Sequence, residues 1–391
     1  MHVPKGLLPI RLSGTFQAIG LTGSAIAVAI VAWGFVSFRS AGNQSEDTPA
    51  PEFDWTSVRS AAFLVHNEGS DQLIIHTPGS DRSPEVLASF ERRGDSAPRG
   101  QASPMVDKVA VVHPALHAGA RLTVVDIDTD EEVTSPAVFD SNTTIAWARD
   151  GSSLVAASST RSDDSGRLNA TLHSVNAATG ETRALATFES VFRVAPVGFS
   201  LDGQRLFVVV LDQAGSSLWS LSGNEATEIA PLSAGRTRDW ALSPDGTMLG
   251  YIEVRSGSSA PTVGRVVFTA TGAPVQASDS MAAQEGVAWQ PGNTLPGFGG
   301  PGGTLRLEAA GLQDASYIVP ESWSPDGTRL IARVVHPAPD GETSEVTWEL
   351  FRSPGAVATT DADDTPARTK IFDQPGEVTF LGWVKSAPNE Q

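Results

Sequence analysis

The segment Trp323-Ser-Pro-Asp-Gly327-Thr-Arg-Leu330 decides the fold of this chain. Proline presets the backbone for a tight turn, the aspartate accepts hydrogen bonds from nearby backbone amides, and glycine adopts positive φ without a Cβ clash. Trp323 and Leu330 flank the turn at positions that can point into one core. The segment therefore predicts a strand, a tight turn and a second strand.

The same eight-residue pattern occurs four times, always with a large apolar residue four positions before the glycine and a leucine three positions after it. The other copies are Trp147–Leu154, Phe199–Leu206 and Leu242–Leu249. The interval from Gly246 to Gly327 is almost twice as long as the intervals between the earlier turn glycines. A regular repeat predicts a fold built from similar sheets, with one further unit inside the long interval.

Two weaker units complete the series. Trp289-Gln-Pro-Gly-Asn293 fills the long interval, with Asn293 at the glycine position, where asparagine also tolerates positive φ. Pro296 replaces the following leucine and disfavours a second strand there. Ser103-Pro-Met-Val-Asp-Lys108 suggests an upstream unit that has lost its turn glycine and precedes an apolar run.

Further strand-like pieces give each unit about four short strands, the composition of a propeller blade. The first unit has strands at 61–66, 72–76 and 84–88 but no turn motif, and the run Val378–Trp383 has no turn after it. If this C-terminal strand completes the first blade, the ring closes without an open strand edge. The expected fold class is an all-β β-propeller over residues 55–385 with seven blades, six being the alternative because the unit near Trp289 is short.

The Ser-Pro-Asp-Gly-Thr-x-Leu motif at this spacing resembles the repeat of the TolB-like β-propeller family, over approximately residues 55–385. The resemblance implies architecture and says little about function. The namesake protein carries a separate α/β domain before its propeller, whereas no stretch of that size fits between Arg39 and Trp55. The resemblance therefore does not extend to a role in that protein's own envelope complex.

The N-terminal residues predict a membrane anchor. No charged residue lies between Arg11 and Arg39, and residues 18–38 are apolar or small throughout. A helix of this length rises about 31 Å, which matches a hydrocarbon core of roughly 30 Å. Lys5 and Arg11 precede the segment, so basic residues favour a cytoplasmic N-terminus and an extracytoplasmic propeller at the cell membrane.

The expected boundaries follow from this transmembrane helix or signal anchor. Residues 1–17 form a short cytoplasmic tail, residues 39–54 a polar, Pro-containing linker, and residues 386–391 a C-terminal tail. The alternative is a cleaved signal peptide with Ser40-Ala41-Gly42 at the cleavage site, which would make the protein secreted.

Composition excludes several classes of function. The chain has 391 residues with 27 basic and 45 acidic side chains, a formal net charge of -18, and no cysteine. The negative charge argues against nucleic acid as a partner. The absence of cysteine excludes disulfides, thiolate metal sites and cysteine nucleophiles.

Two clusters resemble metal ligands and are better explained otherwise. His113-Pro-Ala-Leu-His117 has helical ligand spacing, but Pro114 and the strand pattern argue against a helix and no third ligand accompanies the pair. The acidic run Asp126–Glu132 begins like a calcium loop but has Glu131 and Ala137 where such a loop has glycine and glutamate. A hairpin tip explains this run better.

The recurring turn aspartates and the tryptophans before the turns are interpreted as folding elements, since a single active site would not repeat in every blade. These residues are Asp150, Asp202, Asp245 and Asp326, and Trp147, Trp289, Trp323 and Trp383. No hydrolase elbow, zinc-protease helix or phosphate loop is present. We therefore assign no catalytic, cofactor-binding or metal-ligating residue, and no cofactor, from the sequence.

The remaining functional surface consists of loops, the longest at 161–167, 255–261, 295–303 and 356–366. The first hypothesis is a membrane-anchored, non-catalytic propeller that binds an envelope protein or a glycan. The second is a propeller-based hydrolase or lyase whose site is assembled from scattered loop carboxylates. The third is a sensory ectodomain that works with a membrane partner.

Overall fold

The computed structural model describes Val58 and residues 60–385, except 79, 81–82, 93–97, 115–118, 163–165, 258–260, 278–281, 306, 308–315, 338–343, 354–367 and 373–377. The chain divides into two compact units, Met1–Phe53 and Asp54–Gln391, and every described residue belongs to the second. The predicted membrane segment, linker and terminal tails lie outside the described residues. Among the residues that are described, no helix is long and apolar enough to cross a membrane.

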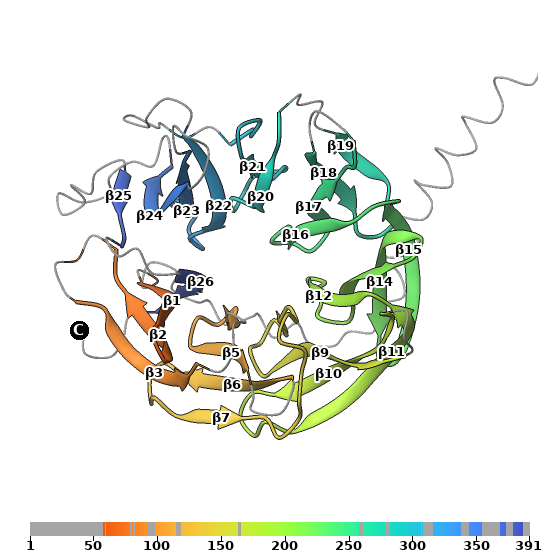
Figure 1. The fold of residues 1–391 in the computed structure, drawn as a ribbon, viewed down its shortest axis with the longest axis horizontal. Helices are drawn as coiled ribbons and strands as arrows, with labels where there is room; N and C mark the ends of the chain where they lie inside the picture. The colour runs from red at the N-terminus through yellow and green to blue at the C-terminus, as the bar shows by residue number, and fades with distance from the viewer. Residues whose placement is uncertain are drawn as a thin grey trace, which may run out of the picture. The chain divides into compact units, whose positions relative to one another are not determined.

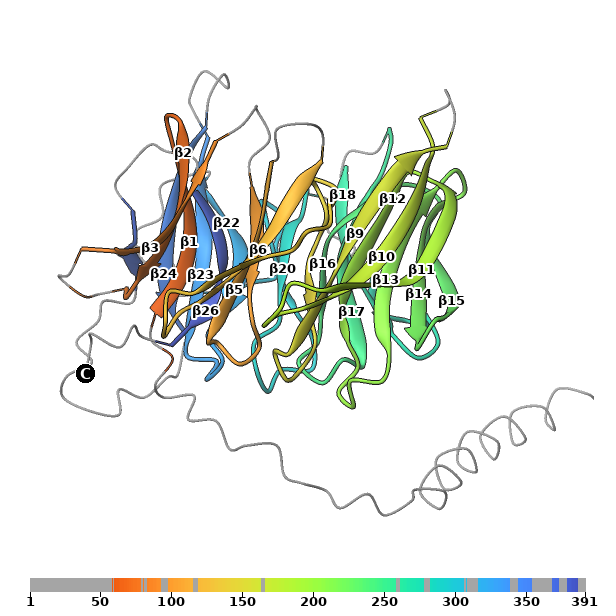
Figure 2. The ribbon, with the colours of Figure 1, turned by 90° about the horizontal axis from the view of Figure 1, so that it is seen from below.

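The second unit is an all-β propeller. Its described residues form six four-stranded sheets and one two-stranded sheet, which follow one another around a ring (Figure 1) and stand side by side when the ring is seen from its edge (Figure 2). We call the four-stranded sheets blades and number them in chain order. In each blade the neighbouring strands are antiparallel.

The first three blades have the following strands. Blade 1 contains β26 (Val378–Val384), β1 (Ser60–Asn67), β2 (Ser70–His76) and β3 (Glu85–Glu91). Blade 2 contains β4 (Arg99–Ala102), β5 (Lys108–Pro114), β6 (Ala120–Asp126) and β7 (Glu132–Thr134). Blade 3 contains β8 (Ala146–Trp147), β9 (Ser153–Arg161), β10 (Leu168–Asn176) and β11 (Thr182–Val191).

The remaining sheets complete the ring. Blade 4 contains β12 (Arg193–Phe199), β13 (Leu206–Asp212), β14 (Gly215–Ser222) and β15 (Glu225–Ser233). Blade 5 contains β16 (Thr237–Leu242), β17 (Met248–Val254), β18 (Thr262–Phe268) and β19 (Pro274–Ala277). The two-stranded sheet contains β20 (Glu285–Ala288) and β21 (Gly297–Gly299). Blade 6 contains β22 (Tyr317–Trp323), β23 (Arg329–His336), β24 (Glu345–Arg352) and β25 (Arg368–Lys370).

The predicted ring closure is confirmed, because the C-terminal strand β26 pairs with the N-terminal strand β1. The register places Phe63 opposite Phe380 and Ala61 opposite Trp383, with a bulge between Ala62 and Phe63. The rings of Phe63 and Phe380 meet edge to face with centroids 5.4 Å apart. Pairing of the two chain ends leaves β1 no open edge.

The four predicted turns form as the motif requires. Gly151, Gly203, Gly246 and Gly327 have φ between +68° and +72°. The turn aspartates accept hydrogen bonds from their own turns, as the Asp326 carboxylate does from the Ser324 hydroxyl at 2.5 Å and the Thr328 amide at 3.0 Å. The assignment of these aspartates to turn capping is therefore confirmed.

The two degenerate turns differ from each other. In blade 2, Val106 takes the glycine's place at φ 53°, an unusual conformation for a β-branched residue. At the two-stranded sheet the prediction for Asn293 was wrong. Gly292 carries the positive φ, 83°, while Asn293 donates its backbone amide to the Gln290 carbonyl at 3.1 Å and its side-chain amide to Gln290 Oε1 at 2.8 Å.

The glycine-rich stretch 297–303, which by sequence resembles a flexible insertion, instead contains strand β21. Gly297 pairs with Ala288 and Phe298 with Val287 of β20. A Cβ at Gly299 would lie 2.2 Å from the carbonyl oxygen of Ile318 in β22, so only glycine permits this backbone approach. Pro296 precedes the strand and therefore shortens it rather than abolishing it.

The hydrophobic core lies between neighbouring sheets. One buried cluster joins blade 1 to blade 2 and includes Leu64, Leu73, Val109 and Val111, all with no exposed surface. Corresponding clusters join each later pair of sheets around the ring. The predicted role of the four tryptophans in blade packing is confirmed, since Trp147, Trp289, Trp323 and Trp383 are 4–8% exposed.

Three of these indoles also bind the sheet before their own. Trp147 donates to the Gln101 carbonyl at 3.0 Å and Trp289 to the Ala241 carbonyl at 2.9 Å, while Trp383 reaches the Ser322 carbonyl at 3.4 Å. The three acceptors occupy the same place in their units, two residues before the serine of the turn. These tryptophans therefore connect three of the sheets to their predecessors around the ring.

Candidate ligand-binding channel

The innermost strands surround two adjoining cavities, one of about 670 Å³ and one of about 420 Å³. Gln101, Trp240 and Glu321 line both of them. The larger cavity is bounded by residues of β4, β12, β16, β22 and β26 and by the segment before β8. Ligand pockets of proteins have comparable volumes, about 300–1,000 Å³. The ring therefore has a channel large enough for a small molecule or the end of a polymer.

Two arginines lie at the starts of inner strands, and one of them, Arg99, lines the channel. Arg99 begins β4, lines the larger cavity and is exposed. Arg193 begins β12, donates from Nη2 to the Asn142 carbonyl at 2.8 Å, and has its guanidinium carbon 5.3 Å from the Trp240 ring centroid. Burial and the charge of Arg99 lower the pKa of Arg193, while Asp140 opposes this shift. The two cations therefore lie near enough to repel each other.

Two carboxylates lie on the inner strands β22 and β16, and one of them, Glu321, lines both cavities. Glu321 of β22 accepts a hydrogen bond from Arg333 Nε at 2.6 Å. Asp239 of β16 pairs with the adjacent Arg238 and accepts the Gly286 amide of β20 at 3.3 Å. Burial raises the pKa of Glu321, the charge of Asp239 raises it further, and Arg333 opposes both. Each carboxylate therefore has a cationic partner of its own.

Arg149 spans the turns at the opposite end of the inner strands. Its guanidinium donates to the Pro244 carbonyl at 3.0 Å and to the Phe199 carbonyl at 3.3 Å. These two carbonyls belong to the turns of blades 5 and 4, while Arg149 itself belongs to the turn of blade 3. The side chain therefore links three consecutive blades beside the smaller cavity, which it lines.

Only one member of the histidine pair considered from the sequence lies within the described residues. His113 lies in β5, where Nε2 is 3.1 Å from the Thr123 hydroxyl and the ring stacks on Phe90, while His117 lies outside the described residues. His66 near the end of β1 and His336 at the end of β23 occupy similar places and bond to Thr379 and Ser316. Histidines at this strand position are therefore recurring ties between strands.

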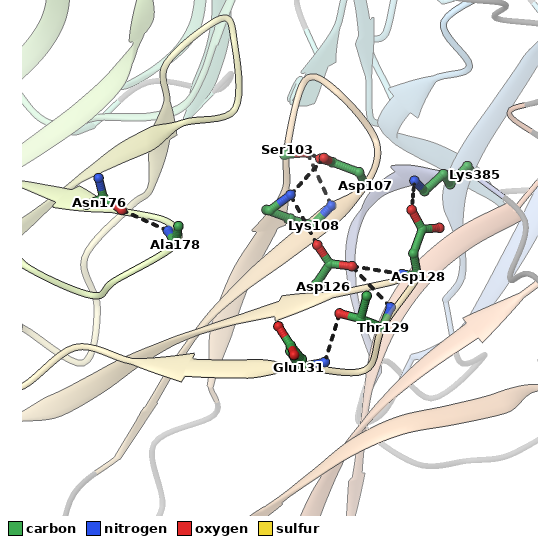
Figure 3. Close-up of polar contacts among 10 residues, drawn as sticks. All are labelled: Ser103, Asp107, Lys108, Asp126, Asp128, Thr129, Glu131, Asn176, Ala178 and Lys385. Carbon is green, nitrogen blue, oxygen red and sulfur yellow. Dashed lines mark hydrogen bonds and ion pairs between the residues drawn. The ribbon is translucent and has the colours of Figure 1, made fainter.

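The acidic run 126–132 forms the predicted hairpin, between β6 and β7. The Asp126 carboxylate accepts the amides of Asp128 at 3.0 Å and Thr129 at 3.2 Å, and Thr129 accepts the Glu131 amide (Figure 3). Lys108 lies 3.2 Å from Asp126 and 2.8 Å from Asp107, and Lys385 pairs with Asp128. Hydrogen bonds and lysines thus account for two of the carboxylates that resembled a calcium loop, those of Asp126 and Asp128.

Sequence reasoning missed that this hairpin also repeats. Asn176 accepts the amides of Ala178 and Thr179 in the same way, and Gly180 has positive φ where blade 2 has Asp130. The segments Asp-Ile-Asp-Thr-Asp-Glu131 and Asn-Ala-Ala-Thr-Gly-Glu181 show the relation once they are aligned. Across the part of the chain that the structure describes, no group of three histidine, aspartate or glutamate side chains could hold a metal ion.

The channel residues were also missed, because no short motif contains them. Arg99, Arg193, Asp239 and Glu321 come from four different inner strands. The available signal was a charged residue at the start of, or within, an apolar inner strand that precedes a recognised turn. That signal places a residue near the channel but does not tell which other charged residues lie close to it in the folded protein.

Fold and channel together define a β-propeller with a charged, aromatic-lined central cavity. No protein-family model and no curated protein sequence matches the chain. Similar solved structures include an oligogalacturonate lyase from Vibrio parahaemolyticus (TM-score 0.53, 13% identity, covering 76% of this chain and 87% of that chain). They also include prolyl oligopeptidase B from Galerina marginata (TM-score 0.51, 12% identity, covering 93% and 57%).

TolB from Acinetobacter baumannii is similar as well, with a TM-score of 0.46 and 13% identity over 82% of this chain and 65% of that chain. The β-propeller fold that the TolB-like resemblance implied is confirmed by the sheets of this chain itself. This chain spans less than two thirds of the length of that TolB protein. At such low identity the similarities describe architecture alone.

Proposed function

We propose that the propeller is a non-catalytic binding module of the cell envelope, whose ligand, an envelope protein or a glycan, enters the central channel. The observation that carries this proposal is the cavity of about 670 Å³ among the inner strands, with the exposed Arg99 on its wall. Glu321 and Asp239 each have an arginine partner, which favours binding over proton transfer. The predicted anchor at 18–38 would hold the module at the extracytoplasmic face of the membrane.

Gln101 offers the most direct test, because its exposed side chain lines both cavities. A photo-reactive residue at this position should cross-link a specific ligand in intact cells, whereas the same residue at the exposed turn position Gln204 should not. Gln101→Trp should fill the channel and abolish capture without lowering the melting temperature. Equal cross-linking at both positions, or capture that survives the tryptophan, would refute a channel site.

An enzyme is the second candidate, and Glu321 is the observation that favours it. Its raised pKa and the nearby charge of Asp239 are features of carboxylate pairs in hydrolases and lyases. Turnover of oligosaccharides or peptides that disappears in Glu321→Gln and persists in Glu285→Gln would establish this alternative. Ligand binding without turnover, with an affinity that Glu321→Gln leaves unchanged, would support the binding module.

We also infer that the two-stranded sheet serves as a seventh blade of reduced size. Its residue Trp289 bonds to blade 5 as Trp147 and Trp383 bond to their preceding sheets. Val287, Trp289 and Phe298 are buried against Ile252 and Val266 of blade 5. A sensory role with a membrane partner stays a prediction.

A further inference from the structure

The starts of β4 and β12 have a local surplus of positive charge in an acidic protein. The Arg99 side chain, which lines the larger cavity, has no hydrogen-bond or ion-pair partner among the described residues. The Nε of Arg193 is buried and likewise has no hydrogen-bond partner there. Asp140 is the carboxylate that acts on Arg193, and it is already bound by the Ser159 amide and hydroxyl at 2.9 and 2.8 Å. A bound anion beside the two guanidinium groups would reduce the repulsion between them.

Resting on the proposed function, we propose that Arg99 and Arg193 bind the C-terminal carboxylate of an extended peptide whose chain runs into the channel. A guanidinium presents a planar fork of donors that matches a carboxylate. Trp240 holds the Arg193 group in place through its ring face. The peptide's single terminal charge matches the small local surplus of positive charge.

The rest of the channel favours a peptide over an acidic polysaccharide. The formal charge of -18, with the Glu321 carboxylate on the channel wall and the Asp239 charge acting on it, would repel a ligand that carries a carboxylate on every residue. The innermost strands β4, β12, β16, β22 and β26 each pair with a strand on one side only. Their other edges offer backbone donors and acceptors, which an extended peptide can use.

The test uses the full-length chain and two pools of N-acetylated hexapeptides of randomised sequence, one with free C-termini and one with amidated C-termini. Affinity selection with mass spectrometry should retain members of the free-acid pool only. The best binder, resynthesised in both forms, should lose at least tenfold in affinity on amidation, since one charge-assisted contact disappears. Its affinity should also fall steeply as salt rises.

Arg99→Gln is the decisive variant, because the side chain is exposed and its replacement should not disturb folding. It should weaken the free-acid peptide at least tenfold and leave the weak binding of the amide unchanged. Arg121→Gln, at an exposed position of β6, is the matched control and should have no effect. Arg193→Gln should act like Arg99→Gln, with its melting temperature measured to separate binding from unfolding.

Equal binding of acid and amide, or insensitivity of the acid to Arg99→Gln, would overturn this inference. Binding of oligogalacturonate with the same Arg99 dependence, in the absence of any peptide binding, would overturn it in favour of an acidic sugar. These outcomes leave the proposed function standing if Gln101→Trp still abolishes capture in cells. Capture that is unaffected by Gln101→Trp would instead remove the channel site itself.

Discussion

Blade 1 and the two-stranded sheet β20–β21 each fill one place in the propeller ring, but they do so in opposite ways. Blade 1 joins the two ends of the chain through seven-residue β26 and eight-residue β1. The two-stranded sheet has strands of four and three residues and no outer strand among the described residues. Both nevertheless place a buried tryptophan against the sheet before them. A place in the ring therefore depends on inner-strand packing more than on the number of strands.

Glycine explains how so small a sheet fits its place. A Cβ on Gly264 of β18 would lie 2.5 Å from Cδ1 of Phe298, and a Cβ on Gly250 of β17 would lie 2.8 Å from Cγ2 of Val287. The side chains of the two-stranded sheet therefore rest directly on the backbone of blade 5. Blade 1 relies instead on strand pairing and on aliphatic side chains shared with blade 2.

The largest expected effect is the loss of ring closure when residues 378–391 are removed. The truncation deletes the buried Leu381, Trp383 and Val384 and opens the edge of β1. Burial of each such side chain stabilises a protein by about 1.5–3 kcal/mol, so the loss approaches a typical total stability of about 5–15 kcal/mol. Near-ultraviolet circular dichroism should show loss of the whole cooperative transition. Removal of the predicted tail 386–391 alone is the control, and an unchanged melting temperature for the longer truncation would contradict the role of β26.

The next effect concerns the contact between Phe298 and Gly264. Phe298→Ala should destabilise the protein by about 3–5 kcal/mol, because it empties a buried site in a small sheet. Gly264→Ala should cost about 1–3 kcal/mol through the clash with the ring. In the Phe298→Ala background the second substitution should cost much less. Urea unfolding of the parent, the two single variants and the double variant measures this coupling. Strictly additive free energies of unfolding would show that the packing of the Phe298 side chain does not depend on Gly264.

Turn glycines should matter less than packing glycines. At Gly203 nothing lies within 4 Å of an added Cβ, but φ is +69°. Gly203→Ala should therefore cost only the backbone strain, about 1–2 kcal/mol, and Gly203→Asn should cost less because asparagine tolerates this conformation. Thermal unfolding distinguishes the variants. If Gly203→Ala lowers the stability as much as Gly264→Ala does, the proposed difference between turn glycines and packing glycines is wrong.

The parts of the fold that were predictable are those fixed by neighbouring residues. Gly151 and Asp150 act within one turn, so the motif that contains them reports their conformation directly. The closure by Phe380 was predictable because an open propeller edge has few alternatives. In contrast, the error at Asn293 arose because Gly292, one position earlier, could take the positive φ at lower cost.

The channel could not be predicted because its geometry depends on the whole ring. Arg99 and Arg193 begin blades 2 and 4, which are two repeat units apart in the chain, and their proximity follows only when the inner strands converge. The same holds for Asp239 and Glu321. These charges affect one another only after folding brings their strands together, and no local sequence pattern predicts which residues will meet.

The smallest expected effect concerns the turn aspartate. Blade 1 and the two-stranded sheet share its absence, since neither has an aspartate in a turn after its inner strand. In blade 4 the Ser200 hydroxyl and the Gln204 amide lower the pKa of Asp202, against a smaller effect of burial. A carboxyl group with a lowered folded-state pKa stabilises the protein above its unfolded pKa of about 4, and this contribution disappears as the pH falls through the folded value. Asp202→Asn should therefore be less stable than the parent chain at pH 7 by roughly 1 kcal/mol, and the difference should shrink between about pH 5 and pH 2. Asn293→Ala in the turn of the two-stranded sheet removes no titrating group, so its effect should not change over that range. Urea midpoints measured at several pH values give both differences, and a gap for Asp202→Asn that stays constant or widens towards acid would mean that the turn aspartate does not stabilise its blade through its charge.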